Sequence, residues 1–255
     1  MLYLMGMGLR GARSLTLEEV DILKRSDSIF LEIYTSVIGE NIQHDIEKLT
    51  GKSVSPVNRN DMEYSDIVTR KAHDSIVSLL VSGDPLMATT HNVLRVKCMD
   101  LGIKVSVLEN ASILNTAVGY SGLSPYKVAP PVSIPRVSDK FFPLSVYKKI
   151  AANFREKRHT VLLLDTGDGN PMTLREAMDV LFRMEEESSE NIISESTLII
   201  CAIRVGFPDE RYIMGSMGAI RELNIRDSPA IMILPSDMDE NEREFTERFC
   251  DRISQ

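Results

Sequence analysis

The chain has 255 residues, of which 43% are hydrophobic, and a formal net charge of −8 at pH 7. This length allows one large or two small domains with a buried core. The acidic balance argues against a surface that grips long nucleic acid, and no apolar run approaches the ~20 residues that a membrane span needs. Residues 1–5 form a strand-length apolar run followed by glycines, unlike a signal peptide. We therefore expect a soluble, cytoplasmic α/β protein that binds neither nucleic acid nor membrane.

The cysteines and histidines predict neither a disulfide framework nor a metal site. The cysteines are odd in number and far apart, and no histidine has a partner at a metal-ligand spacing such as HExxH. These residues are Cys98, Cys201 and Cys250, with His44, His73, His91 and His159. We expect reduced, mostly buried thiols and no bound metal.

A glycine-rich loop, Gly6–Gly11, directly follows a predicted first strand at residues 2–5. It matches the GxGxxG fingerprint of dinucleotide-binding turns, and Glu32 lies about 20 residues further on, where that fingerprint places its ribose-binding acid. The sequence Thr-Leu-Glu-Glu at 16–19, however, is a capping box that starts the next helix at Thr16. That start lies too far beyond Gly11 for a helix N-terminus to meet a pyrophosphate. A Rossmann dinucleotide-binding oxidoreductase is therefore the weaker alternative.

Strand and helix patterns then alternate through the first half of the chain. Strands are predicted at 28–33, 53–57, 76–81 and 104–108, and helices at 16–25, 41–49, 65–75 and 90–101. Polar and aromatic residues at 34–36 follow the strand at 28–33. Because ligands of open α/β sheets bind beyond the carboxyl ends of the strands, these are candidate cleft residues, with an ordinary loop as the equal alternative.

The stretch at 81–91, Val-Ser-Gly-Asp-Pro-Leu-Met-Ala-Thr-Thr-His, joins the strand at 76–81 to the helix at 90–101. Gly83 permits a backbone shape that a Cβ would forbid, and Pro85 fixes φ, so Asp84 is expected on a stiff turn. Taken alone, this stretch is more typical of a plain turn followed by a helix cap at Thr89 or Thr90 than of a ligand-binding loop. Further on, Ser112 is a candidate cap for a helix that runs to Gly119.

Repeated glycine and proline residues at 119–143 predict the crossing between two domains, 1–123 and 124–255. A strand is expected at about 127–134. The second half then predicts helices at 144–157, 173–187 and 241–253, strands at 160–164, 198–204 and 230–234, a hairpin partner near 212–216, and a loop at 165–171.

Several stretches, in the same order along the chain, resemble the diphthine synthases, a branch of the tetrapyrrole methylase superfamily of S-adenosylmethionine-dependent methyltransferases. They are Leu-Tyr-Leu-Met-Gly-Met-Gly-Leu at 2–9, Leu-Glu-Ile-Tyr-Thr-Ser at 31–36, the Gly-Asp-Pro string at 83–91, Asn-Ala-Ser-Ile-Leu-Asn at 110–115, His-Thr-Val-Leu-Leu-Leu-Asp at 159–165 and Arg-Val-Gly at 204–206. The resemblance implies two α/β domains of the tetrapyrrole methylase type, with the cofactor cleft between them.

The resemblance also implies which residues bind S-adenosylmethionine and release S-adenosylhomocysteine, and it assigns no catalytic residue. The implied cofactor-binding residues are Leu9, Asp84, Met87, Ser112, Ile113, Leu164, Val205 and Ala230. For Leu164 and Val205, a core position at a strand end is an equal alternative. The chain departs from the family at Gly11 and Ala12, where acidic residues are usual. It also departs after Asp165, where residues 166–170 intervene before Met172 and Thr173.

The implied reaction methylates the amino group of a 3-amino-3-carboxypropyl side chain built on one histidine of translation elongation factor 2. The product is diphthine or, after a further methylation of the carboxylate, its methyl ester, in diphthamide biosynthesis. A tetrapyrrole C-methyltransferase of the same superfamily is the first alternative, and a module that senses the cofactor without turnover is the second. A homodimer is expected by analogy with the family.

Overall fold

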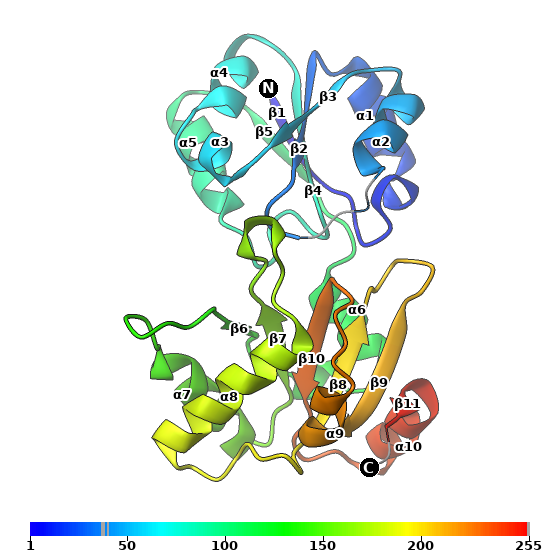
Figure 1. Ribbon diagram of the computed structural model, residues 1–255. Helices are drawn as coiled ribbons and strands as arrows, with labels where there is room; N and C mark the ends of the chain where they lie inside the picture. Colours follow the sequence, from blue (N-terminus) through cyan, green and yellow to red (C-terminus); the bar gives the residue numbers. More distant parts are fainter. Residues whose placement is uncertain (37–38, 40, 254–255) are drawn as a thin grey trace. The chain divides into compact units, whose positions relative to one another are not determined.

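The computed structural model describes residues 1–36, 39 and 41–253 (Figure 1). The chain divides into two compact units, Met1–Ile113 and Leu114–Gln255. Each unit is built from a sheet with helices, which confirms the expected fold class of two α/β domains. The expected domain limits of 1–123 and 124–255 stay a prediction.

In the described residues of the first unit, five strands form a parallel sheet in the order β3-β2-β4-β1-β5. The strands are β1 (Leu2–Gly6), β2 (Ser28–Glu32), β3 (Val54–Val57), β4 (Val77–Val81) and β5 (Val105–Leu108). Since all pairings are parallel, the carboxyl ends share one edge of the sheet. The usual Rossmann order places β1 between β2 and β4, whereas here β4 lies between β1 and β2.

Helices cover both faces of this sheet (Figure 1). One face carries α1 (Leu17–Arg25) and α2 (Ile42–Thr50), and the other carries α3 (Arg59–Glu63), α4 (Ile67–Asp74) and α5 (His91–Asp100). Alternate residues of β2 enter different cores: Phe30 packs with Leu94 of α5, while Ile29 packs with Ile22 and Ile46. Strands that are apolar on both faces are typical of such covered parallel sheets.

The glycine loop does not lead directly into a long helix. It passes first through a short 3₁₀ helix, η1 (Gly11–Ser14), and α1 then begins with the predicted capping box. Thr16 Oγ1 accepts from the Glu19 N–H at 3.2 Å, and Glu19 Oε2 accepts from the Thr16 N–H at 2.6 Å. No dipole of a long helix is therefore directed at the glycine loop, which disfavours the dinucleotide fingerprint.

In the described residues of the second unit, six strands form a mixed sheet in the order β11-β9-β8-β10-β7-β6. They are β6 (Val132–Ile134), β7 (Thr160–Leu164), β8 (Leu198–Ile203), β9 (Arg211–Ser216), β10 (Ala230–Leu234) and β11 (Asp251–Arg252). The antiparallel pairing of β8 with β9 confirms the predicted hairpin. Two expectations were inexact. The predicted strand at 127–134 is limited to β6, and η2 (Pro125–Lys127) overlaps its first residue, while β11 replaces the end of the predicted helix at 241–253. The helix α9 (Met217–Glu222) was not foreseen.

The main core of the second unit lies between this sheet and α7 (Leu144–Arg155), α8 (Leu174–Ser188) and α9. The remaining helices are α6 (Ile113–Tyr120) and α10 (Glu240–Phe249), and η3 (Gly167–Gly169) lies in the predicted loop. Cys98, Cys201 and Cys250 are free and buried, as expected. Burial raises the pKa of the Cys201 thiol, and it raises the pKa of Cys250 to about 11, so neither thiol is activated. Within the described ranges, no helix combines the length and hydropathy needed to cross a membrane.

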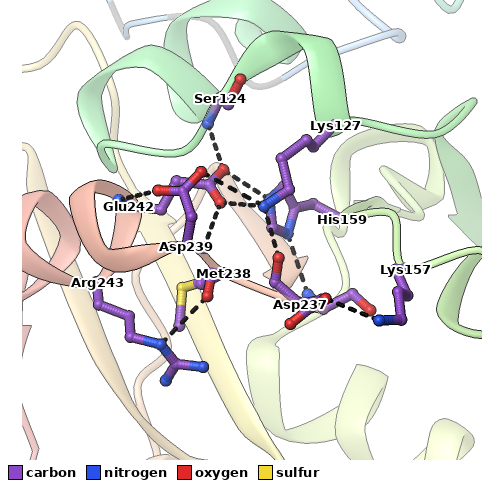
Figure 2. Close-up of polar contacts among 10 residues, drawn as sticks. Ser124, Lys127, Lys157, His159, Asp237, Met238, Asp239, Glu242 and Arg243 are labelled. Carbon is purple, nitrogen blue, oxygen red and sulfur yellow. Dashed lines mark hydrogen bonds and ion pairs between the residues drawn. The ribbon is translucent and has the colours of Figure 1, made fainter.

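A buried polar cluster ties α10 to two other parts of the second unit (Figure 2). Glu242, which is 3% exposed, accepts at Oε1 from the Ser124 N–H at 2.8 Å and from His159 Nε2 at 2.9 Å. Its Oε2 accepts from Lys127 Nζ at 2.5 Å. One carboxylate thus joins α10 to η2 and to the residue before β7.

The partners of His159 define its tautomer. The Ser236 N–H donates to Nδ1 at 3.0 Å, so Nδ1 accepts and the ring proton lies on Nε2, which donates to Glu242. Both ring nitrogens are used and the side chain is fully buried. His159 is therefore a structural residue, with no nitrogen left for a metal or for proton transfer.

Replacing Glu242 by glutamine is expected to destabilise the protein in a pH-dependent way. Burial alone would raise the pKa of Glu242, but hydrogen bonds from Lys127, Ser124 and His159 outweigh it and lower the pKa from 4.5 to about 2. A depression of this size corresponds to about 3 kcal/mol of stability, present above pH ~4.5 and lost as the pH falls towards 2. Denaturant unfolding of Glu242→Gln should show this loss at pH 7 and a smaller one at pH 3.

Glu244→Gln is the matched control, because Glu244 lies exposed on the same helix. It should change stability by less than about 0.5 kcal/mol at either pH. An equal loss of stability in Glu242→Gln at pH 7 and at pH 3 would contradict stabilisation by the charge of Glu242.

Candidate functional site

The loops that follow β1, β4 and β5 meet at the carboxyl edge of the first sheet, which we call the β1/β4/β5 edge. The Gly8 N–H donates to the Gly83 carbonyl at 3.1 Å, and the Gly83 N–H donates back to the Gly8 carbonyl at 2.8 Å. Beyond β5, Asn110 Nδ2 donates to the carbonyls of Gly6 at 2.9 Å and Ser14 at 3.0 Å. The glycine loop is thus clamped between the Gly-Asp-Pro loop and Asn110.

This clamp requires glycine at two positions of the loop. A Cβ on Gly6 would lie 2.5 Å from the Gly83 carbonyl oxygen, and one on Gly8 would lie 2.7 Å from Asn110 Oδ1. Gly8 also has a φ of +56°, which residues with a Cβ rarely adopt. The glycines are therefore explained by the close approach of the Gly83 backbone and the Asn110 side chain, without a pyrophosphate.

Asp84 lies on a stiff turn, as predicted. Its Oδ1 accepts from the Leu86 N–H at 2.8 Å, and the Met87 N–H approaches the Asp84 carbonyl at 3.4 Å. The second carboxylate oxygen makes no hydrogen bond to any described residue, and the side chain is only partly buried. The Met87 side chain beside it is 44% exposed. The turn thus presents one free carboxylate oxygen and a flexible apolar side chain to a ligand.

The structure brings five of the predicted cofactor residues to the β1/β4/β5 edge, on the loops just described. They are Leu9, Asp84, Met87, Ser112 and Ile113. Leu9 follows Gly8, while Ser112 is buried two residues after Asn110, and α6 begins at the next residue. The five residues come from segments that are far apart in the sequence, and the parallel sheet is what gathers them.

The other three predicted cofactor residues gather at one edge of the second sheet. Leu164 ends β7, Ala230 begins β10, and Val205 follows the end of β8. Because β10 pairs antiparallel with both β7 and β8, its first residue lies beside their last residues, with Ala230 opposite Ile203. The register therefore places Leu164, Val205 and Ala230 together, although their role in binding stays a prediction.

Glu32 does not serve the role that the dinucleotide alternative gave it. The residue is 1% exposed, and its Oε1 accepts from the Thr35 N–H at 2.7 Å and from the Tyr34 N–H at 3.4 Å. Its Oε2 lies 3.1 Å from His91 Nε2. A carboxylate turned into the protein in this way cannot hydrogen-bond a ribose, so the spacing that suggested the ribose-binding acid was misleading.

His91 is the residue of this region that the sequence analysis did not identify. It contacts both Glu32 and the Gly-Asp-Pro loop, and it lines a cavity of about 290 Å³ in the first unit. Tyr34, one of the predicted cleft residues, lines the same cavity, together with Met62 and Leu94. The available signal was the position of His91 at the end of the Gly-Asp-Pro string, but nothing in the sequence pairs it with Glu32.

Among the described residues, no group of three or more His, Cys, Asp or Glu side chains is placed to hold a metal ion.

Comparison with known proteins matches residues 1–220 to the family described as Tetrapyrrole (Corrin/Porphyrin) Methylases. The diphthine synthase of Thermoplasma acidophilum is 42% identical over 256 residues, covering 100% of this chain and 97% of the relative. That of Methanocorpusculum labreanum is 32% identical and covers 98% of this chain and 99% of the relative. A crystal structure of an Entamoeba histolytica protein, itself proposed to be a diphthine synthase, has a TM-score of 0.89 at 29% identity, covering 100% of this chain and 99% of that one.

The two α/β units and the β1/β4/β5 edge, together with the family match over residues 1–220, define a methyltransferase of the tetrapyrrole methylase type. Within that class, the chain belongs to the diphthine synthase family. Both the family and the enzyme class expected from the sequence are confirmed.

Proposed function

We propose that this protein transfers methyl groups from S-adenosylmethionine to the amino nitrogen of a 3-amino-3-carboxypropyl side chain on one histidine of translation elongation factor 2. The product is diphthine or, after one further methyl transfer to the carboxylate oxygen of the same side chain, its methyl ester, in diphthamide biosynthesis. The observation that carries the proposal is the 42% identity, over the full length of the chain, to a protein named diphthine synthase.

The residues at the β1/β4/β5 edge suit the proposed cofactor. The bound cofactor supplies a methyl group on a positively charged sulfur, which a nucleophile can accept directly. The free oxygen of Asp84 offers a hydrogen-bond acceptor and a compensating negative charge. Leu9, Met87 and Ile113 offer apolar surface, and Ser112 offers a hydroxyl. A sulfonium cation suits this set of one carboxylate, one hydroxyl and three apolar side chains.

Leu164, Val205 and Ala230, which lie in the second unit, are also proposed to bind the cofactor. All three are apolar, so we expect contacts through backbone groups and through the walls of the pocket, as opposed to charge. Their common place at the ends of β7, β8 and β10 supports this assignment.

The chemistry asked of the protein is mainly positioning. The acceptor amine attacks in its neutral form, and a site of low polarity favours that form. Aligning the amine with the methyl group and excluding water contribute several kcal/mol to lowering the barrier. No general base is required by this reaction, and we assign none.

The proposed substrate is a protein, elongation factor 2, and the proposed location is the cytoplasm. By analogy with the family, we propose a homodimer that binds neither nucleic acid nor a membrane and uses no metal.

Methylation of a tetrapyrrole ring is the competing function, because the matched family takes its name from corrin and porphyrin methylases. The test is transfer of labelled methyl groups from S-adenosylmethionine to three acceptors: elongation factor 2 with the aminocarboxypropyl side chain, the same factor with unmodified histidine, and uroporphyrinogen. We expect label only in the first. Label in uroporphyrinogen would favour the tetrapyrrole function, and cofactor binding with no labelled acceptor would favour a sensing module.

A further inference from the structure

His91 holds the Gly-Asp-Pro loop by its backbone. The residue is the first of α5 and is 2% exposed. Its Nδ1 lies 2.9 Å from the Pro85 carbonyl oxygen, which also accepts from Thr89 Oγ1 at 2.9 Å. Because a carbonyl oxygen only accepts, Nδ1 must carry a proton and donate it. This contact closes the loop one residue after Asp84.

The other side of the same ring faces a buried carboxylate. His91 Nε2 lies 3.1 Å from Glu32 Oε2, and neither atom makes a well-formed hydrogen bond to a described residue. Glu32 is in turn fixed at Oε1 by the Thr35 N–H at 2.7 Å.

Burying two ionisable side chains costs desolvation free energy that two apolar side chains do not cost. Buried ionisable pairs contribute little net stability, because desolvation offsets their attraction. Two apolar side chains of similar volume would fill the same space equally well. What the pair adds is a fixed link from the end of β2 to the Pro85 carbonyl.

The loop needs this restraint because its backbone is strained. Ala88, between Asp84 and His91, has a φ of +56°, which is costly for a residue with a Cβ. Without the contacts to the Pro85 carbonyl, the loop would relax towards ordinary φ values. Relaxation would change the direction in which the turn presents the Asp84 carboxylate.

We infer that His91 is a positioning residue, anchored by Glu32, which holds the Gly-Asp-Pro loop in the shape that binds the cofactor. The inference rests on the proposed function, in which Asp84 and Met87 contact S-adenosylmethionine. His91 acts through the Pro85 carbonyl and does not itself touch the cofactor.

Two amide substitutions separate the two sides of the ring. The amide nitrogen of asparagine falls near Nδ1 and keeps the donor to Pro85, whereas that of glutamine falls near Nε2 and keeps only the Glu32 side. In calorimetry, we expect the affinity of His91→Asn for S-adenosylhomocysteine to lie within about threefold of the wild-type affinity. We expect His91→Gln to bind about tenfold more weakly than the wild type, because it loses one buried hydrogen bond. If His91 acted through packing alone, His91→Asn would not bind S-adenosylhomocysteine more tightly than His91→Gln.

Two further variants complete the design. Glu32→Gln should bind within about threefold of the wild type, because its amide can donate to a neutral Nε2 and still accept from the Thr35 N–H. His73→Ala, an exposed histidine on the neighbouring helix α4, is the matched control and should bind as the wild type does. Thermal unfolding of each variant shows that it is folded under the conditions of the binding experiment.

Equal affinities in His91→Asn and His91→Gln, or wild-type affinity in His91→Gln, would overturn the inference while leaving the proposed function intact. Failure of the wild type to bind S-adenosylhomocysteine would overturn the proposed cofactor, and this inference with it. The two failures are therefore distinguished by the wild-type measurement.

Discussion

Asp84→Ala is expected to weaken the binding of S-adenosylmethionine by about tenfold to a hundredfold and to reduce methyl transfer at least as much. A hydrogen bond to a charged group is worth roughly 1.5–3 kcal/mol, and one oxygen of Asp84 makes no hydrogen bond to a described residue, so it can accept from the cofactor. The substitution also removes the acceptor of the Leu86 N–H, which loosens the turn. Calorimetric titration with the cofactor measures the affinity directly.

Asp84→Asn separates the charge from the turn. Its amide oxygen still accepts from the Leu86 N–H, so any remaining loss of affinity reports the missing negative charge. Asp100→Ala, at an exposed position at the end of α5, is the matched control and should leave the affinity unchanged. Wild-type affinity in Asp84→Ala would show that Asp84 does not contact the cofactor.

Gly6→Ala is expected to cost several kcal/mol of stability and to abolish cofactor binding. The new Cβ would lie 2.5 Å from the Gly83 carbonyl oxygen and 2.9 Å from Pro85 Cδ, neither of which is a flexible side-chain end. Overpacking a tight site typically costs about 1–3 kcal/mol, and here the backbone of the Gly-Asp-Pro loop itself must move. Thermal unfolding followed by titration with the cofactor measures both effects.

Gly119→Ala is the control for this substitution. Gly119 lies in α6 without a positive φ, and a Cβ there would meet no described atom within 4 Å beyond its own helix and chain neighbours. Alanine should therefore be tolerated, and it should raise stability by roughly 0.5–1 kcal/mol because it restricts the unfolded chain and favours the helix. Equal stability of Gly6→Ala and the wild type would contradict the tight approach of the loops.

The α/β class and most of the elements could be predicted from the sequence because their signals are local. The capping box at Thr16 and the buried run in β4 each depend on a few neighbouring residues, and both are present in the structure. The misses are short: α3 has too few residues to show a helical period, and β11 forms through pairing with the distant β9. Local patterns hold no information on such pairing.

The candidate site was predictable in part, for the same reason. The stiff turn at Asp84 follows from Gly83 and Pro85, which act within the loop. The contact of Glu32 with His91 depends on the sheet order, in which β2 lies beside β4, and on the direction of two side chains. Spacing along the chain suggested a ribose ligand for Glu32, but it could not show that the carboxylate is buried.

The proposed reaction is methylation of one modified histidine of elongation factor 2. Its most direct test is mass spectrometry of that factor, carrying the aminocarboxypropyl side chain, after incubation with this protein and S-adenosylmethionine. The expected result is stepwise addition of methyl groups to that residue by the wild type and none by Asp84→Ala. The final number of methyl groups distinguishes diphthine from its methyl ester. An unmethylated histidine derivative, in the presence of a protein that binds the cofactor, would contradict the claim.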